Sequence, residues 1–493
     1  MRTPQLADNL RRAVLQAAIE GKLNDRTSED ARDLLAAIQT EKTAQQKTGK
    51  QKKNKPLAAI SEEEIPFAIP ENWVWVRLGD ILFQLTDGTH STPKYVEQGI
   101  PFLSVKNISS GKISFQDTKF ISEDEHLELT KRCKPEKGDI LLSKVGTTGI
   151  PVLIEDEVEF SIFVSVALLK FPNNLINSKF LLNIIQSPFV QEQAQGNTRG
   201  VGNKNWVLTS IANTLIPLPP LTEQQQIVAK LNRLLAEIDN LKTQEQALLA
   251  AQNAFPKKLR AAILQAAVQG ELNERTDENA RDLFAAIQAE KAALQKAGKL
   301  KKDKPLAAIS EEEIPFAIPE NWVWVRLGEI SSKITDGSHN PPPKRVSGIP
   351  ILSAANIFEQ KIQFSSANRW ISYEEWEIEN KRTSIDPNDV LLTIVGTIGR
   401  TAVVEDDTKF ALQRSVAVIK PILISSIYLS YLLQSPFLLE IMTLVSKGTA
   451  QKGIYLNSLK DLPIPLPPLS EQQQIVAKLE TLLAEIDTLE NAA

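Results

Sequence analysis

The sequence contains very little cysteine and histidine. Cys133 is the one cysteine among 493 residues, and the histidines are His90, His126 and His339. A single cysteine excludes a framework of disulfide bonds and any zinc site built from paired cysteines. Three scattered histidines leave little material for metal binding or for general-base catalysis.

The sequence also lacks a long apolar segment. Its first residues, MRTPQLADNLRR, have no apolar core and do not have the pattern of a signal peptide. The longest uncharged run, residues 421–439, contains two prolines, four serines and a glutamine. This composition favours a buried helix over a membrane span. We therefore expect a cytoplasmic chain with no membrane contact.

Familiar catalytic motifs are missing as well. The sequence has no GxxxxGK[ST] phosphate loop, no HExxH motif and no GxSxG motif. The segment closest to the Asn/Asp-Pro-Pro-aromatic loop of adenine methyltransferases is Asn340–Pro343, which lacks the aromatic residue. The acidic groups at 123–125 and 405–407 are interpreted as solvated loops. A net charge of −4 also gives the whole chain no basic character of the kind that binds nucleic acid.

What the sequence does contain is one unit written twice. LRRAVLQAAIEGKLNDRT at 10–27 returns as LRAAILQAAVQGELNERT at 259–276, and IPLPPLTEQQQIVAKL at 216–231 returns at 464–479 with one change. The middles, 81–215 and 330–463, share only short islands such as TDGTH and TDGSH. The chain therefore holds two related domains that have a common frame and different central parts.

The repeated flanks predict long helices. Apolar residues recur at alternating spacings of four and three after each PLPPL segment, which is the pattern of a helix that packs on another helix. Pro256 interrupts the central copy, so we expect a kink or two abutting helices there. The second copy is split between the two chain ends, which predicts a pseudo-twofold arrangement; the alternative is a helix that merely joins two domains. The seam consists of Ile227, Leu231, Leu234, Ile238, Leu241, Leu248, Ile475, Leu479, Leu482 and Ile486.

These features divide the chain into seven segments. Lysine-rich stretches that end at Lys55 and Lys304 are interpreted as solvated basic linkers, with contact to phosphate as the alternative. The predicted fold class is α+β, with two mixed α/β domains separated by long antiparallel helices. In chain order the segments are 1–24 (half of a helix), 25–65 (basic linker), 66–219 (first domain), 220–272 (central helix), 273–314 (basic linker), 315–467 (second domain) and 468–493 (the other half-helix).

The candidate binding residues are polar side chains in loops of the two middles, two of which, 196–206 and 446–455, are polar and glycine-rich. Arg, Lys, Asn and Gln are the side chains that read base edges in the major groove, although a solvated surface is an equally good interpretation for each of them. In the first domain they are Lys94, Lys106, Asn107, Lys144, Thr147, Arg199, Lys204 and Asn205. In the second domain they are Lys344, Arg345, Asn356, Arg400, Lys447, Gln451 and Lys452.

The chain resembles the specificity (S) subunits of type I restriction-modification systems. The resemblance covers essentially the whole sequence and rests on DGTHSTPKY, GIPFLSVKNI, GDILLSKVGTTG, IPLPPLTEQQQIVAKL and the twofold repeat. It implies two target recognition domains, each reading one half of a split sequence in double-stranded DNA. It also implies that the helices form an antiparallel pair which sets the gap between the half-sites.

The same resemblance implies the partners and the division of chemistry. Two methyltransferase (M) subunits would dock on the helices and restriction (R) subunits would join the complex. S-adenosylmethionine, ATP and Mg are expected in those partners, and this chain would bind no cofactor or metal and have no catalytic residue. Two other classes stay open: a helical scaffold without DNA contact, and an enzyme in its own right.

Overall fold

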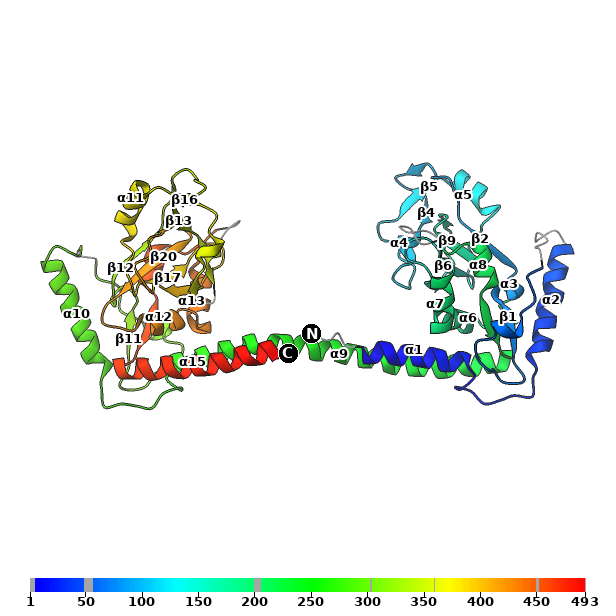
Figure 1. Ribbon diagram of the computed structural model, residues 1–493, viewed down its shortest axis with the longest axis horizontal. Helices are drawn as coiled ribbons and strands as arrows, with labels where there is room; N and C mark the ends of the chain where they lie inside the picture. Colours follow the sequence, from blue (N-terminus) through cyan, green and yellow to red (C-terminus); the bar gives the residue numbers. More distant parts are fainter. Residues whose placement is uncertain are drawn as a thin grey trace. The chain divides into compact units, whose positions relative to one another are not determined.

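The computed structural model describes residues 5–47, 56–198, 205–301, 304–358, 360–448 and 452–492. The chain forms two compact units, Met1–Leu249 and Ala250–Ala493, which we call unit 1 and unit 2. One helix, α9 (Leu221–Gln269), runs from the first unit into the second (Figure 1). The expected mixture of helices and strands, with a long helix between the two domains, is confirmed.

Helix α9 continues through Pro256, so of the two expectations for this position that of two abutting helices is wrong. It is a single helix of 49 residues that includes Pro256 in its interior. A proline removes the hydrogen bond to the carbonyl four residues earlier, here that of Gln252. Gln252 is exposed, so water can satisfy the freed carbonyl and the helix continues through this position.

In unit 1, helix α1 (Leu6–Ile19) packs along the first half of α9 (Figure 1). The Lys242 ammonium lies 2.8 Å from the carboxylate of Asp8, and Arg11 forms an ion pair with Asp239. Since numbers rise along α1 as they fall along α9, the two helices are antiparallel.

In unit 2, helix α15 (Leu469–Ala492) packs along the second half of α9 in the same sense. Arg260 of α9 pairs with Asp487 and, at 3.1 Å, with Glu490. Further back along α15, Glu471 receives a hydrogen bond from Asn273, which follows α9 in the chain. The antiparallel pairing of unit 1 is therefore repeated.

The predicted apolar seam is buried over most of its length but not at Leu248. Ile227, Leu231, Ile238, Ile475, Leu479 and Ile486 are buried, and Leu234, Leu241 and Leu482 are partly buried. Leu248 is 60% exposed. The described part of α1 begins opposite Glu245, whose carboxylate accepts from the Ala7 N–H at 3.4 Å, so α1 does not cover Leu248.

The segments interpreted as basic linkers contain helices. Helix α2 (Ala31–Lys47) and helix α10 (Ala280–Lys296) occupy much of 25–65 and 273–314. Each buries one isoleucine completely, Ile38 in α2 and Ile287 in α10. The alanine-rich sequence favours a helix, and this apolar anchor holds it against its unit.

The strands of unit 1 form three sheets. β1 (Val74–Arg77) pairs antiparallel with β10 (Leu215–Leu218), so the segments that enter and leave the domain lie side by side. An antiparallel sheet has the order β2-β9-β6-β7, and a mixed sheet has the order β3-β5-β4-β8 with β4 and β8 parallel. Their bounds are β2 Gln84–Asp87, β3 Tyr95–Val96, β4 Ile100–Leu103, β5 Lys119–Ile121, β6 Ile140–Ser143, β7 Pro151–Leu153, β8 Ser161–Ile162 and β9 Val166–Lys170.

Unit 2 repeats this plan with small differences. β11 (Val323–Arg326) pairs with β21 (Pro463–Leu466), and the antiparallel sheet has the order β12-β20-β17-β18. The remaining strands form the sheet β16-β13-β19 and the pair β14-β15. Their bounds are β12 Ser331–Asp336, β13 Ile349–Leu352, β14 Ile357–Phe358, β15 Lys361–Ile362, β16 Trp370–Ile371, β17 Val390–Thr393, β18 Thr401–Val403, β19 Ala411–Leu412 and β20 Val416–Pro421.

Short helices pack on these sheets in both units. Those of unit 1 are α3 (Leu78–Ile81), α4 (Val105–Ile108), α5 (Glu123–Thr130), α6 (Ser178–Gln186), α7 (Pro188–Gly196) and α8 (Leu208–Asn213). Those of unit 2 are α11 (Tyr373–Thr383), α12 (Ser426–Leu432), α13 (Pro436–Val445) and α14 (Leu456–Lys460).

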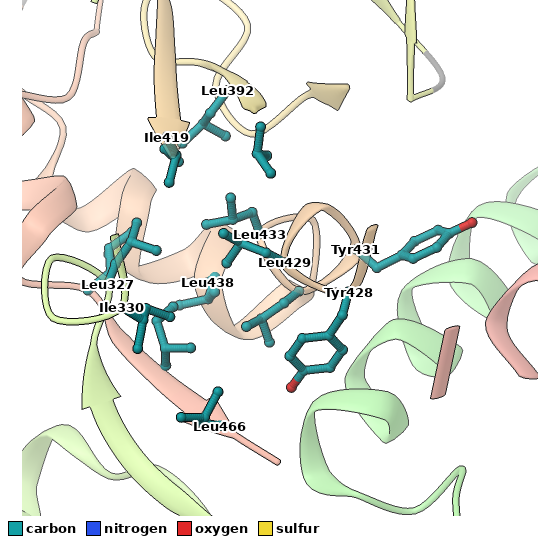
Figure 2. Close-up of a cluster of buried hydrophobic side chains, with 14 of the residues drawn as sticks. Leu327, Ile330, Leu392, Ile419, Tyr428, Leu429, Tyr431, Leu433, Leu438 and Leu466 are labelled. Atoms are coloured by element: carbon teal, nitrogen blue, oxygen red, sulfur yellow. The ribbon is translucent and has the colours of Figure 1, made fainter. Parts of the chain in front are cut away.

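The uncharged run 421–439 lies mainly in the core of unit 2, as a broken pair of helices. α12 and α13 bury Leu429, Leu433 and Leu438 against Leu392, Ile419 and Leu466 (Figure 2). Tyr428 is buried there too, and its hydroxyl donates to the carbonyl of Pro465 at 3.0 Å. Among the described residues no single helix has the length and apolarity to cross a membrane; α12 and α13 qualify only as a pair, bent by 67°.

Candidate nucleic-acid interface

A three-residue segment between β8 and β9 joins several loops of unit 1. We call Phe163–Ser165 the junction segment of unit 1. The N–H of Phe163 donates to the β4 end at Leu103 (2.8 Å), and that of Val164 donates to Thr89 in the loop after β2 (3.0 Å). Ser165 accepts the N–H of Lys144 on its carbonyl (2.9 Å) and the N–H of Val105 on its hydroxyl (3.1 Å).

The junction also fixes the polar glycine-rich loop that precedes α8. Val145 forms an antiparallel bridge with Asn205, and the N–H of Trp206 donates to the carbonyl of Lys144 at 2.8 Å. The loops after β2, β4 and β6 and the end of the loop before α8 therefore meet at one place.

Unit 2 has the same arrangement around Gln413–Ser415, its junction segment. The backbone N–H of Gln413 donates to the carbonyl of Leu352 (2.8 Å), and that of Arg414 donates to the carbonyl of Ser338 (2.9 Å). Ser415 accepts from Ile394 (2.9 Å) on its carbonyl and from Ala354 (3.1 Å) on its hydroxyl. The loop before α14 is held by a bridge between Val395 and Gly453. The backbone frame is thus common to both units.

Two glycines allow the loops after β2 and β12 to approach the ends of β8 and β19 closely, next to the junction segments. A Cβ atom at Gly88 would lie 1.9 Å from the carbonyl oxygen of Ile162, and one at Gly337 would lie 2.2 Å from that of Leu412. Only glycine fits such an approach. This explains the TDG element that the two divergent domains share.

The aspartate of each TDG element is buried and contacts basic side chains. In unit 1, Asp87 contacts the Lys144 ammonium at 3.2 Å, the Arg132 guanidinium at 2.5 Å and the His90 ring at 3.3 Å. Lys144 is buried with it, whereas the side chain of Arg132 is 54% exposed. One carboxylate therefore fixes the position of three basic side chains beside the junction.

In unit 2 the equivalent carboxylate is Asp336. It forms an ion pair with Arg382 and contacts the His339 ring at 2.7 Å. Ile394 stands where unit 1 has Lys144. The aspartate, histidine and arginine recur in both units, and the lysine does not.

Part of the predicted site residues gather at the junctions. In unit 1, exposed Thr147 and half-buried Asn205 flank the turn after β6, and exposed Lys106 follows Val105. In unit 2, exposed Lys452 lies beside the corresponding turn, since the N–H of Gly396 donates to its carbonyl at 3.3 Å, and exposed Lys447 is hydrogen-bonded to Gly453, the residue after Lys452, at 2.9 Å.

Three predicted residues are buried and serve the local fold. Lys144 pairs with Asp87, as described above. Asn107 and Asn356 accept the backbone N–H groups of Ser104 and Ser353, each at 2.9 Å. The asparagine side chains thus cap the short turns after β4 and β13, and neither presents its amide to solvent.

The other predicted residues lie apart from the junctions or outside the described residues. Exposed Lys94 precedes β3, and exposed Lys344 precedes Arg345, which forms two hydrogen bonds with Glu375 (3.0 and 3.3 Å). Arg400 stacks over the ring of Phe358 at 4.9 Å. Arg199, Lys204 and Gln451 lie outside the described residues. A role in DNA binding stays a prediction for all fifteen candidates.

Sequence reasoning missed three arginines at this site. Arg132 and Arg382 belong to a Lys-Arg pair that recurs 250 residues apart, at 131–132 and 381–382. That recurrence was a usable signal, although two residues are a short island. Arg414 occupies the junction segment of unit 2 and is exposed where unit 1 has Val164.

Each domain is tied to its long helix by a buried glutamate. Glu223 accepts hydrogen bonds from Trp73 (2.7 Å), Asn72 (2.6 Å) and Asn24 (2.7 Å), and its carboxylate pairs with Arg26 at 2.7 Å. Burial by itself raises the pKa of Glu223. The donated hydrogen bonds, with that of the Thr27 N–H foremost, outweigh this effect and lower the pKa to about 2.

Unit 2 repeats this contact at Glu471. Trp322, Asn321, Asn273 and Arg275 occupy the places of the unit 1 donors, and the pKa of Glu471 is again lowered to about 2 by donated hydrogen bonds that outweigh burial. Trp73 and Trp322, which directly precede β1 and β11 at the domain entrances, therefore make a polar contact with the long helices.

The described residues hold no cluster of three His, Cys, Asp or Glu side chains with the geometry of a metal site. Burial raises the pKa of the Cys133 thiol to about 12. That thiol is protonated at neutral pH.

Comparison with known proteins identifies the family. The model of the "Type I restriction modification DNA specificity domain" matches residues 70–250 and 319–493. The specificity subunit of the Escherichia coli type I restriction enzyme EcoAI is 30% identical, across 97% of this chain and 89% of the relative. That of the E. coli enzyme EcoEI is 29% identical, across 98% of this chain and 90% of the relative.

Solved structures give weaker similarity. The HsdS subunit from Thermoanaerobacter tengcongensis is 21% identical, with a TM-score of 0.37, across 87% of this chain and 93% of that one. The family model, in contrast, covers both halves of the sequence, and the relative at 30% identity spans almost all of it. The chain therefore belongs to the family of specificity subunits of type I restriction-modification systems.

Proposed function

We propose that this chain reads a bipartite double-stranded DNA target, with one half-site recognised by each unit. The observation that carries the proposal is a common backbone frame with different side chains at the junctions. Lys144 and Val164 of unit 1 correspond to Ile394 and Arg414 of unit 2. Two surfaces that share a backbone frame and differ in their side chains suit the recognition of two different DNA sequences.

The long helices are the proposed docking site for two methyltransferase subunits. Helices α1, α9 and α15 expose the large apolar side chains of Leu6, Leu10, Leu248, Phe255 and Leu489. Exposed apolar side chains of this size favour protein contacts. The restriction subunits would then join the complex that these contacts create.

In this proposal the chain supplies recognition and its partners supply the chemistry. The methyltransferase subunits would bind S-adenosylmethionine, and ATP and Mg would serve the restriction subunits. The absence of familiar catalytic motifs from the sequence supports this division of labour. A cytoplasmic location follows, because the DNA and the partners are there.

The test is to express the chain with its methyltransferase subunits in cells that lack other DNA methylation. Sequencing of modified bases should reveal one bipartite motif with a fixed gap. The purified complex should bind a duplex that carries this motif more tightly than a scrambled duplex. Methylation without sequence preference, or binding by the methyltransferase subunits alone, would contradict the proposal.

A further inference from the structure

Among the described residues, an exposed arginine occupies the equivalent place beside each junction segment. Arg132 and Arg382 follow a lysine at equivalent positions, and each contacts the buried aspartate of its TDG element. Around them the two domains differ, as the pairs Lys144/Ile394 and Val164/Arg414 show. An arginine that is present in both domains, where the surrounding side chains differ, suits a contact that does not depend on the DNA sequence.

We propose that Arg132 and Arg382 each bind a phosphate of the DNA backbone. The inference rests on the proposed function and goes beyond it, because it separates the residues that position the DNA from those that read it. Phosphate contacts fix register and orientation without carrying sequence information.

The geometry suits this role because the described contacts of each guanidinium, including that of Arg382 with the His339 ring at 3.5 Å, leave some of its N–H donors unused. The guanidinium of Arg132 lies 2.5 Å from the Asp87 carboxylate and 3.4 Å from the carbonyl of Gly88. Arg382 donates its Nε–H to the carbonyl of Asp336 at 3.0 Å and pairs with the carboxylate of the same residue. Arginine has five N–H donors, so donors remain for a second partner.

Exposure and anchoring together distinguish these arginines from ordinary surface cations. The aspartates are buried, whereas the arginine side chains are 54% and 49% exposed. An arginine that is already oriented loses less conformational entropy when it binds phosphate, and its planar fork matches phosphate oxygens. The contact with the TDG turn also places each guanidinium beside the junction segment.

The simpler alternative is that the arginine only clamps the TDG turn to a helix, with Arg132 just after α5 and Arg382 within α11. The two roles differ in their salt dependence. Each phosphate contact that is lost reduces the slope of log K against log salt by about 0.9. A purely structural clamp changes affinity through folding and leaves that slope unchanged.

The experiment uses the full-length chain in complex with its methyltransferase subunits. The substitution Arg132→Gln removes the charge and keeps hydrogen-bond donors for Asp87. Binding is measured from about 50 to 200 mM salt on two duplexes, one with the methylated motif and one with a scrambled sequence. Lys137→Gln is the matched control: Lys137 is an exposed lysine of the same unit, 57% accessible, which precedes β6 at the end away from the junction.

We expect Arg132→Gln to weaken binding to both duplexes by the same factor, roughly tenfold, and to lower the salt slope by about one. Combination with Arg382→Gln should lower the slope by about two. The Lys137→Gln control should match the wild type, and the methylated motif should keep its bases in every variant.

Three results would overturn the proposal. They are an unchanged salt slope in Arg132→Gln, an equal change in the control, and a change of base preference at one half-site. If Arg132→Gln lowers the melting temperature of the complex, the Arg132→Lys variant, which keeps the charge, must restore the slope. A wild-type complex that does not bind its methylated motif would contradict the proposed function itself, whereas the results above concern the arginines alone.

Discussion

At the scale of single residues, Glu223 joins the long helix to the entrance of unit 1. Its buried carboxylate collects donors from the segment after α1, from the domain entrance and from Arg26. A buried acceptor with several charged or polar partners is costly to replace, because each donor then loses its partner.

We expect Glu223→Gln to destabilise unit 1 by about 3 kcal/mol, because the glutamine amide group faces donors with a donor of its own. Differential scanning calorimetry of the full chain measures the loss. Glu29→Gln is the matched control, since Glu29 is exposed and accepts from Thr222 of the same helix at 2.7 Å. The control should change stability by less than about 0.5 kcal/mol; equal losses would contradict the role given to Glu223.

The low pKa values of Glu223 and Glu471 predict sensitivity to acid. A carboxyl group with a pKa of about 2 in the folded state, below its usual value of 4.5, stabilises the fold above about pH 4.5. This contribution is about 3 kcal/mol per group and is lost as the pH falls from 4.5 towards 2. Thermal melts at successive pH values should show the decline, and the decline should be smaller in Glu223→Gln.

Gly88 tests the close packing at the junction. We expect Gly88→Ala to displace the loop after β2, because the new Cβ would overlap the carbonyl of Ile162. Such overpacking costs about 1–3 kcal/mol, and the half-site read by unit 1 should be methylated poorly. Gly196→Ala is the control, since a Cβ at Gly196 would meet no described atom within 4 Å beyond its own helical turn. Normal methylation by Gly88→Ala would show that the loop has no part in recognition.

Individual site residues were harder to predict than the frame that holds them. Thr147 and Lys452 sit at a junction as the glycine-rich sequence suggested, yet Lys144, Asn107 and Asn356 point inward. Residue type cannot separate these cases, because a lysine or asparagine in a loop serves a buried partner as readily as a ligand. Only the tertiary position of Asp87 reveals that Lys144 is paired.

At the scale of elements, the sequence predicted the long helices that pack on one another. It did not predict helices α2 and α10. The heptad pattern located α1, α9 and α15, since a long apolar seam is a strong signal. The lysine-rich composition concealed α2 and α10, whose apolar faces each contain one fully buried isoleucine and partly buried neighbours. Pro256 was given too much weight, because its effect depends on whether the freed carbonyl is solvated.

The central helix predicts a ruler for the gap between half-sites. Residues 244–252 of α9 have no copy at the chain ends. Four residues inserted after Leu249 would lengthen the helix by about 6 Å and turn it roughly 40° beyond a full turn. The gap in the methylated motif should grow by about one to two base pairs, at 3.4 Å per base pair.

Four added residues roughly preserve the apolar seam, whereas two would rotate it away from its partner. An insertion of two residues is therefore the comparison, and it should reduce methylation overall. Methylome sequencing reports both. Altered half-site bases together with the original gap would contradict the ruler.

At the scale of the whole molecule, the central feature is the internal duplication. The repeated flanks predicted two similar domains, and the structure extends the similarity to the bonds around both junction segments. The central segments 81–215 and 330–463 share only short stretches of sequence, because strands and loops tolerate different side chains on one backbone frame. The short segments that both domains share, such as TDG, lie where the backbone frame tolerates few other residues. In TDG the aspartate is buried in ion pairs and the glycine lies close to another strand.

The most direct test replaces residues 81–215 by residues 330–463 of the same chain, so that both units carry the same recognition surface. The flanks, the long helix and the methyltransferase contacts stay as they are. Methylome sequencing of cells that express this chain with its methyltransferase subunits should show the second half-site twice, with the first half-site gone. A motif that retains the first half-site, or new bases at both positions, would contradict independent reading by the two units.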